Sequence, residues 1–354
     1  MTDTATANER VCLPMQIPDG IRMVKVAGIA EAKRVARDSA VSFAAEVNFG
    51  AQSFVQAKTG KRSCLALDHH GPELSGRPAV AIQAYGDTET SYWRWIPKQM
   101  EELGVENATI IVAGQPDEDA CAAIAIALGV VPHWSFPDIF PEASDWAKTN
   151  YGRNVGHAIQ LIGRVDCDPN QAFALLDTVV GRQILTFRQF SFRADDILAW
   201  WGGVERMRTI LSTAPSSVTE SAASKFEAEL ERVAALGKHR FGKHVVAVDL
   251  SEFGNNSLYY RKLLEEVEIL VAFIGNALGE GQVTLASRDM TTAVKLLGPR
   301  GQLDLYPHLR AWGNAGGREV LGGLDRSMSF TMEDAKAAAE AIASFIAEQK
   351  RAAK

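Results

Sequence analysis

The sequence predicts an α/β fold: a parallel-sheet N-terminal domain with helices on both faces, followed by a smaller C-terminal α/β domain. Short runs that are apolar on both faces alternate with helical stretches, as expected for the buried strands of a parallel sheet. The length of 354 residues, with 47% hydrophobic and 23% charged residues, is typical of a globular chain of about two domains.

We expect residues 1–20 to form a flexible arm and residues 21–211 to form the first domain. The spacing of apolar residues predicts one or two amphipathic helices over 29–54 and further helices over 91–103 and 120–128. Buried strands are predicted at Cys64–Leu67, Ala79–Ala84 and Ala108–Ala113.

A change in composition marks the boundary between the domains. Helical periodicity over 171–178 and 197–211 gives way to a segment dense in Ser, Thr and Ala, so we expect a linker with a helix at 212–236. The second domain is then 237–354. Its predicted strands are His244–Leu250, Ile269–Ile274 and Gln282–Ser287, and a final helix over Met332–Lys350 follows the capping-box pair Thr331 and Asp334.

Composition excludes several classes of function. The formal net charge of −6 disfavours an extended nucleic-acid-coating surface. No apolar run reaches about 18 residues, which predicts no membrane span. Four separated cysteines and a polar start without a signal-peptide pattern predict free thiols and a cytoplasmic location.

The chain contains no Walker A, GxGxxG or GxSxG pattern. A nucleotide triphosphatase, a Rossmann dehydrogenase and a serine hydrolase therefore have no motif to support them.

Two polar segments follow predicted strands. The run ending at Val112 opens into a loop with Asp117, Glu118 and Asp119, and the run ending at Leu67 opens into Asp68-His69-His70. Ligands of open parallel sheets bind beyond the carboxyl ends of the strands, and clustered carboxylates there favour a divalent cation. The alternatives are that Asp117 or Asp119 merely caps the next helix and that the two histidines lie in a solvated loop.

Together these segments resemble the DHH phosphoesterase superfamily, in which an Asp-x-Asp loop and an Asp-His-His loop jointly bind a pair of Mn²⁺ or Mg²⁺ ions. The resemblance implies catalytic roles for Asp68, His69 and His70. It implies metal ligation, with Fe²⁺ and Zn²⁺ as competing ions, by Asp117, Asp119, Asp68, His69 and Asp138. Asp166 and Asp168 are further metal candidates, or part of an Asp-Pro turn.

The C-terminal region resembles the family's associated domain. Val283–Arg288 is similar to its Ser-x-Arg or Ser-Arg strand end, and Gly316–Gly323 is similar to its Gly-Gly-His-x-x-Ala-Ala-Gly turn. The resemblance implies that substrate is bound by Arg288, Gly316, Gly317 and Arg318. The alternatives are an ordinary glycine-rich turn and a surface salt bridge of Arg318.

The chain departs from the family at three points. The Asp-x-Asp loop follows the Asp-His-His loop instead of preceding it, Ala113 stands near the position of the first motif's histidine, and Arg318 replaces the histidine of the glycine-rich turn. The resemblance implies a metal-dependent hydrolase that uses a metal-activated water on a small anionic substrate, phosphoester or nucleotide-like. A non-phosphate substrate, or a non-catalytic nucleotide-binding or regulatory protein, is the alternative. A short oligonucleotide substrate and a homodimer both stay open.

Overall fold

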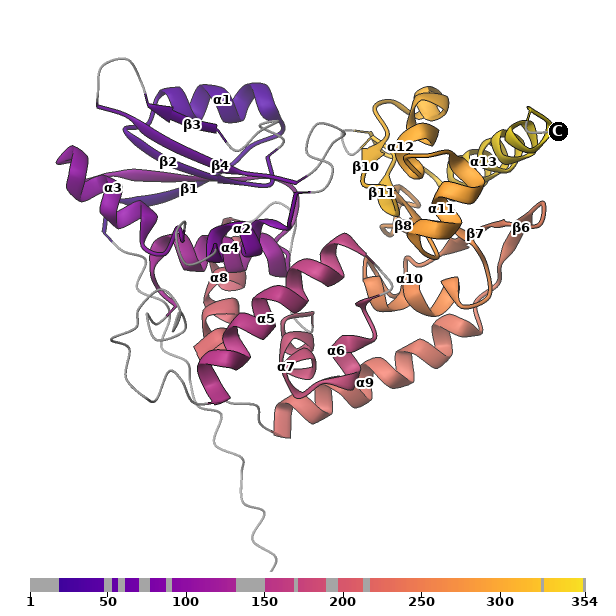
Figure 1. Ribbon diagram of the computed structural model, residues 1–354, viewed down its shortest axis with the longest axis horizontal. Coiled ribbons are helices and arrows are strands. Elements are labelled where there is room, and N and C mark those ends of the chain that lie inside the picture. The colour runs from indigo at the N-terminus through magenta and orange to yellow at the C-terminus, as the bar shows by residue number, and fades with distance from the viewer. Residues whose placement is uncertain are drawn as a thin grey trace, which may run out of the picture.

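The computed structural model describes residues 19–47, 53–56, 61–69, 77–86, 91–131, 150–168, 171–188, 197–212, 217–325 and 328–352. These residues form two sheets, each with its own helices, in the mixed α/β architecture that the sequence predicts (Figure 1). We call sheet A with helices α1–α8 the N-lobe, and sheet B with helices α10–α13 the C-lobe. Residues 1–18 of the expected arm lie outside the described part of the chain.

Sheet A contains four parallel strands and one antiparallel edge strand, β3. In spatial order its strands are β1 Ile21–Lys25, β5 Ala108–Val112, β2 Val41–Ala45, β4 Ser63–Leu67 and β3 Ser53–Gln56. The central strand β2 is therefore flanked by β5 and β4, the two strands that the polar segments follow. This order decides which side chains meet at the carboxyl edge of the sheet.

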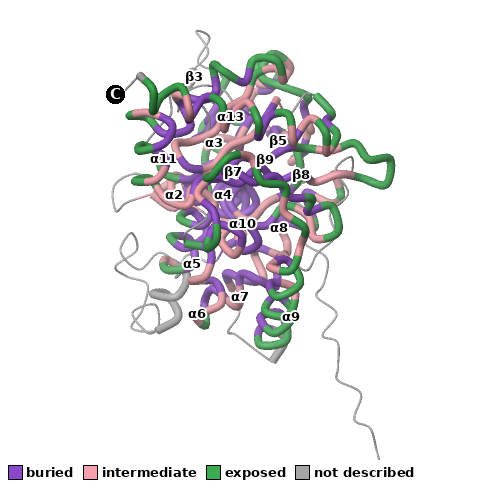
Figure 2. Tube along the Cα trace, turned by 90° about the vertical axis from the view of Figure 1, so that its right-hand side faces the viewer, coloured by how far each residue is buried: buried purple, intermediate pink, exposed green. Residues whose placement is uncertain are grey.

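Helices cover both faces of sheet A, as predicted. On one face Phe43 and Ile110 pack with α2, α3 and α4, while on the other Ala44 and Ile111 pack with α1. The N-lobe helices are α1 Ile29–Arg37, α2 Val80–Tyr85, α3 Trp95–Leu103, α4 Glu118–Leu128, α5 Asn150–Cys167, α6 Ala174–Asp177, α7 Val179–Arg188 and α8 Ile197–Ser212. The small residues of α4 allow close packing on all sides, and Figure 2 shows this helix in the buried interior.

Sheet B is mostly antiparallel, with one parallel pair, β7 and β8. In order its strands are β10 Gly316–Gly317, β11 Leu321–Gly323, β9 Gly281–Ser287, β8 Ile269–Gly275, β7 Val245–Asp249 and β6 His239–Phe241. Its helices are α10 Ser257–Leu264, α11 Met290–Leu297, α12 Gln302–Leu305, the 3₁₀ helix η4 Tyr306–Trp312 and α13 Met332–Ala352. Thr331 and Asp334 form the predicted capping box, with each side chain bonding the other residue's backbone N–H.

The expected linker contains a packed helix, α9 Ser217–Ala234. Phe226 and Leu230 on this helix are buried in the same apolar cluster as Tyr259 of α10 and Trp200 of α8. The apolar core therefore runs from the N-lobe through α9 to one face of sheet B. The domain limits at 211 and 237 stay a prediction. None of the described helices has the length and apolar character needed to cross a membrane.

The helical prediction for residues 29–54 is wrong beyond Arg37. The chain turns at Asp38 and enters the fully buried strand β2, and β3 follows. The sequence of this strand is Val-Ser-Phe-Ala-Ala, and its alanines favour a helix weakly. The central position of the strand in the sheet overrides this helix preference.

The predicted strand Ala79–Ala84 is the helix α2. The Asp119 carboxylate accepts hydrogen bonds from the backbone N–H groups of Val80 (2.7 Å) and Ala81 (3.0 Å) and so satisfies the start of this helix. A short apolar run is ambiguous between strand and helix, and here a carboxylate from a distant segment favours the helix.

We predict that Phe226→Ala lowers the free energy of unfolding by about 3–5 kcal/mol, because it empties a core position shared by α9 and α10. Urea denaturation followed by far-UV circular dichroism measures this. Lys225→Ala, on the exposed side of the same helix, is the control and should change stability by less than about 0.5 kcal/mol. Equal losses in both variants would contradict the packing of α9 described here.

Candidate metal centre and its neighbouring arginine

The carboxyl ends of three adjacent strands converge on one place in the N-lobe. Glu46 directly follows β2, Asp68 and His69 directly follow β4, and the loop after β5 leads to Asp117 and Asp119. Because β2 lies between β4 and β5, the two sequence motifs meet across it. Their reversed order along the chain therefore does not prevent them from forming one site.

His69 lies at the centre of this site and is 1% exposed. Its Nε2 is 2.7 Å from Glu46 Oε1, 3.2 Å from Asp166 Oδ2 and 3.9 Å from Asp119 Oδ2. One ligating atom from each of these four residues lies within 4.8 Å of all the others. Such a group of three carboxylates and one imidazole suits a divalent cation such as Mn²⁺.

Local structure holds each of these side chains in place. Glu46 adopts a left-handed backbone conformation, with φ of 54°, in the turn after β2. This conformation is unfavourable for a residue with a Cβ, and such strain is found where function requires a particular side-chain direction. The two N–H groups of α2 orient the Asp119 carboxylate, and Asp166 lies in the last turn of α5.

The carboxylates repel one another. Burial raises the pKa of Glu46 well above its usual value, and the nearby charges of Asp117, Asp166, Asp119 and Asp68 raise it further. Burial also raises the pKa of Asp119, as do the charges of Asp166 and Asp117, although the two N–H bonds from α2 act in the opposite direction. A bound cation would relieve this repulsion, so the residues present fit a divalent metal.

The remaining predicted residues of the N-lobe have different positions. Asp117 caps α4 by accepting a hydrogen bond from Ala120 N–H (2.8 Å), which is the capping role that the sequence left open, and its charge also acts on Glu46. Asp68 is buried, and its Oδ1 accepts a hydrogen bond from His69 N–H (2.7 Å). Metal ligation by Asp117 and Asp68 stays a prediction. His70 and Asp138 lie outside the described residues.

Cys167 lies next to the cluster, with its sulfur 3.7 Å from His69 Nδ1. Burial raises the pKa of this thiol strongly, and the charge of Asp166 adds to the effect. The thiol is therefore protonated at neutral pH and is a poor nucleophile. This disfavours cysteine-based catalysis at this place.

Arg318 reaches the cluster from the C-lobe. Strands β10 and β11 form a hairpin, and Arg318 N–H donates to Leu321 O (2.7 Å) at its turn. The guanidinium Nη2 contacts His69 Nδ1 and donates to the Arg77 carbonyl oxygen (2.6 Å). Arg318 is therefore the residue by which the C-lobe touches the candidate metal centre, in place of the surface salt bridge that the sequence left open.

The glycines near Arg318 accommodate a tyrosine. The Tyr306 hydroxyl lies 2.9 Å from both the Arg318 carbonyl oxygen and Gln302 Oε1, underneath the hairpin. A Cβ at Gly322 would collide with this hydroxyl, and Gly317 has a φ of 147°, which side chains rarely adopt. These contacts account for the glycines without an anion. Substrate binding by Gly316 and Gly317 stays a prediction.

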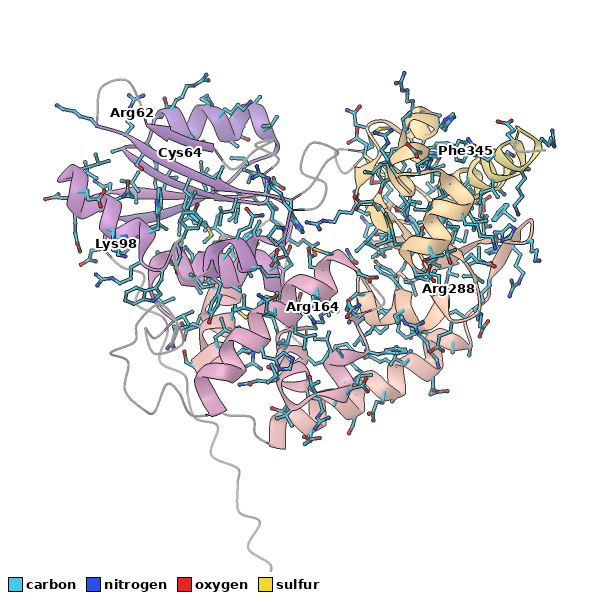
Figure 3. The ribbon with its side chains drawn as sticks, viewed as in Figure 1. Arg62, Cys64, Lys98, Arg164, Arg288 and Phe345 are labelled. Carbon is cyan, nitrogen blue, oxygen red and sulfur yellow. The ribbon has the colours of Figure 1, made fainter. Side chains whose placement is uncertain are left out.

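Arg288 is not brought together with the cluster. Its Nε donates to the carbonyl oxygens of Leu264 (3.0 Å) and Val267 (3.1 Å), which ties the end of β9 to the end of α10. Figure 3 shows Arg288 among the elements of the C-lobe, away from the N-lobe. These contacts give Arg288 a structural role, and a role in substrate binding stays a prediction.

Sequence reasoning missed Glu46, although Asp166 was among its weaker candidates. The signal for Glu46 was an acidic residue directly after an apolar run, but that run was interpreted as part of a helix. Asp166 lies within α5, not in the Asp-Pro turn that the sequence left open. Only the fold shows that this helix end faces His69.

Comparison with known proteins identifies no family. No protein-family model matches the chain. No curated protein matches it. Among solved structures, the pGpG-specific phosphodiesterase PggH from Vibrio cholerae is similar over 71% of this chain and 88% of its own, with 13% identity and a TM-score of 0.36. A likeness at this level does not identify an activity for this chain.

The raised carboxyl pKa values predict how pH and metal act on stability. A group whose pKa is raised by folding stabilises the folded state while it is protonated, and that contribution is lost as the pH rises from the usual carboxyl range of about 4 through the raised pKa. Metal-free protein should therefore lose stability with rising pH through this window. Saturating Mn²⁺ should raise the melting temperature more at pH 8 than at pH 5, as differential scanning calorimetry can measure.

Glu46→Gln provides the internal check on this prediction. The variant removes one repelled charge, so at pH 8 it should melt at a higher temperature than the parent without metal and respond less to Mn²⁺. Asp38→Asn, at the exposed end of α1, should behave like the parent. A Mn²⁺ response that is equal at both pH values would contradict the account.

Proposed function

We propose that this protein is a metal-dependent hydrolase that acts on a small anionic substrate of the phosphoester class. The observation that carries the proposal is the group of Glu46, His69, Asp119 and Asp166, whose ligating atoms lie within 4.8 Å of one another at the carboxyl edge of sheet A. Three hard oxygen donors and one imidazole fit Mn²⁺ or Mg²⁺, and the raised pKa of Glu46 and Asp119 supports the same conclusion.

Glu46, His69, Asp119 and Asp166 would hold a divalent ion here, and the ion would supply Lewis acidity and lower the pKa of bound water. The residues of the chain supply the arrangement around it. Asp119 is oriented by two backbone N–H groups, and His69 is oriented by contacts on both ring nitrogens. A site prepared in this way needs little reorganisation when substrate arrives.

Arg318 supplies a positive charge from the C-lobe that contacts His69 of the candidate metal centre. Its guanidinium stays protonated at every physiological pH, so it can bind an anionic group but cannot act as a base. The resemblance of the Asp-x-Asp and Asp-His-His segments to DHH phosphoesterases supports the same class of reaction. The replacement of the family's histidine by Arg318 favours substrate anchoring over proton transfer at that position.

We predict that Glu46→Gln and Asp166→Asn each weaken Mn²⁺ binding about 100-fold or more, because each removes a charged oxygen donor. Asp119 is less suitable for this test, since its carboxylate also holds α2. Isothermal titration with Mn²⁺ measures the affinity, and Asp38→Asn is the control. A parent protein that binds no Mn²⁺ would refute the proposal.

The same variants test catalysis. Parent protein with Mn²⁺ should hydrolyse members of a panel of phosphate monoesters, diesters and short oligonucleotides, and both variants should lose most of that turnover. Binding of Mn²⁺ by the parent without hydrolysis of any of these compounds would instead support the non-catalytic alternative. The two measurements together therefore separate metal binding from turnover.

A further inference from the structure

Cys167 places a sulfur donor beside the candidate metal centre, and the proposed function does not use it. This cysteine is the last residue of α5, directly after Asp166, and its sulfur lies 3.7 Å from His69 Nδ1. One ligating atom from each of His69, Asp166 and Cys167 lies within 4.8 Å of the other two. These three residues, which we call the sulfur-containing group, therefore overlap the four residues of the candidate metal centre in His69 and Asp166.

The two groups suit different ions. The candidate metal centre adds the carboxylates of Glu46 and Asp119 to the shared pair, whereas the sulfur-containing group adds one thiol. Carboxylate oxygens suit Mn²⁺ and Mg²⁺, while thiolate and imidazole ligands together favour Zn²⁺. The same histidine and aspartate therefore belong to one group for a hard ion and to another for a thiophilic ion.

The spacing of sulfur and imidazole is compatible with a zinc ion. Zinc lies about 2.3 Å from a sulfur ligand and about 2.0–2.1 Å from a ring nitrogen, so two such ligands of a tetrahedral ion are about 3.6 Å apart. The Cys167 sulfur and His69 Nδ1 are 3.7 Å apart. On the other side of the ring, Glu46 Oε1 lies 2.7 Å from Nε2 and can accept its N–H. A carboxylate in that position is the usual orienting partner of a metal-binding histidine.

The end of α5 favours a cation at this position. The last carbonyl groups of a helix carry a partial negative charge, and the Asp166 carboxylate lies in the same turn. The Asp166 side chain is 30% exposed, so an ion can reach the group from solvent. Arg318 opposes a cation here because its guanidinium contacts His69 Nδ1, and an ion that binds through this nitrogen displaces that contact.

We propose that Cys167 is a metal ligand and that Cys167, His69 and Asp166 form a binding position for a thiophilic divalent ion such as Zn²⁺. When the metal–sulfur bond forms, the proton of the thiol is released to solvent, and no electron is transferred. Because His69 and Asp166 belong to both groups, Zn²⁺ bound to Cys167 withdraws two ligands from the candidate metal centre. Zn²⁺ therefore competes with Mn²⁺ for the protein.

This inference deepens the proposed function by naming a thiophilic ion as an inhibitor of the Mn²⁺-dependent reaction. It rests on that function only for the effect on turnover, since binding of Zn²⁺ to Cys167 does not require a reaction. The binding position and the hydrolase activity can therefore be tested separately.

Cobalt substitution tests the sulfur ligand directly. Metal-free protein, reduced with a phosphine instead of a thiol, is titrated with Co²⁺, and the near-ultraviolet charge-transfer absorption of a cobalt–thiolate bond is followed. We expect this absorption to saturate at one ion per chain in the parent and to be absent in Cys167→Ala and Cys167→Ser. Cys64→Ala is the matched control and should keep the absorption, because this buried thiol lies at the start of β4 and the site follows the end of that strand.

Competition between ions tests the shared ligands. Zn²⁺ is added to protein that is loaded with Mn²⁺, and the Mn²⁺ released to solution is measured by electron paramagnetic resonance. Cys167→Ala should weaken the affinity for Zn²⁺ about tenfold or more and should change the affinity for Mn²⁺ much less. Cys167→Ser, which nearly keeps the size of the side chain, should behave like Cys167→Ala, and circular dichroism confirms that each variant is folded.

A parent protein that binds no Co²⁺, or binds it without the charge-transfer absorption, would overturn this proposal. Equal losses of Zn²⁺ and Mn²⁺ affinity in Cys167→Ala would also overturn it, because the sulfur would then not select between the ions. If the absorption is present but the parent binds no Mn²⁺, this binding position stands and only the proposed hydrolase is refuted. If Mn²⁺ binds and supports turnover without the absorption, the hydrolase stands and only this inference is refuted.

Discussion

Mutual repulsion among closely spaced, largely buried carboxylates is the interaction on which the candidate site depends. Glu46, Asp119 and Asp166 surround one imidazole, and burial strengthens every charge interaction among them. The Asp119 carboxylate also accepts hydrogen bonds from the first N–H groups of α2, and these bonds offset part of the repulsion. One carboxylate therefore serves the fold and the site together, and the free energy lost to repulsion can be recovered when a cation binds.

Two of the connections between the lobes have different physical characters. Helix α9 joins them through an apolar core that includes Phe226 and Tyr259, while Arg318 joins them through polar contacts with His69 and Arg77. The first connection sets the positions of the lobes and resists change because it buries apolar surface. The second leaves two buried nitrogens, Arg77 Nη1 and Arg318 Nε, without a hydrogen-bond acceptor.

Sequence patterns predicted those parts of the fold that are determined locally. Strands β4, β5 and β7–β9 are short, mainly apolar runs and were recognised, as were α4, α8 and α13. Strand β2 was missed because its Ser and Ala residues have no strong preference for strand over helix. Its conformation is set by pairing with β4 and β5 on either side. Helix α2 was interpreted as a strand because its N-terminal cap comes from Asp119, which lies 39 positions later.

The residues of the site likewise divide into those that local sequence indicates and those that only distant contacts bring together. Asp119 and His69 were found because each follows a recognisable strand, but Glu46 was hidden by the missed β2. The meeting of His69 with Arg318 spans 249 positions, and no local pattern reports such a contact.

The most direct measurement is anomalous X-ray diffraction at the manganese edge from crystals grown with Mn²⁺. The account predicts an anomalous peak for a manganese ion that is coordinated by oxygen atoms of Glu46, Asp119 and Asp166 and by a ring nitrogen of His69. A well-ordered crystal structure with no peak at these four residues, or with manganese bound only elsewhere, would contradict the claim that this cluster is a metal centre.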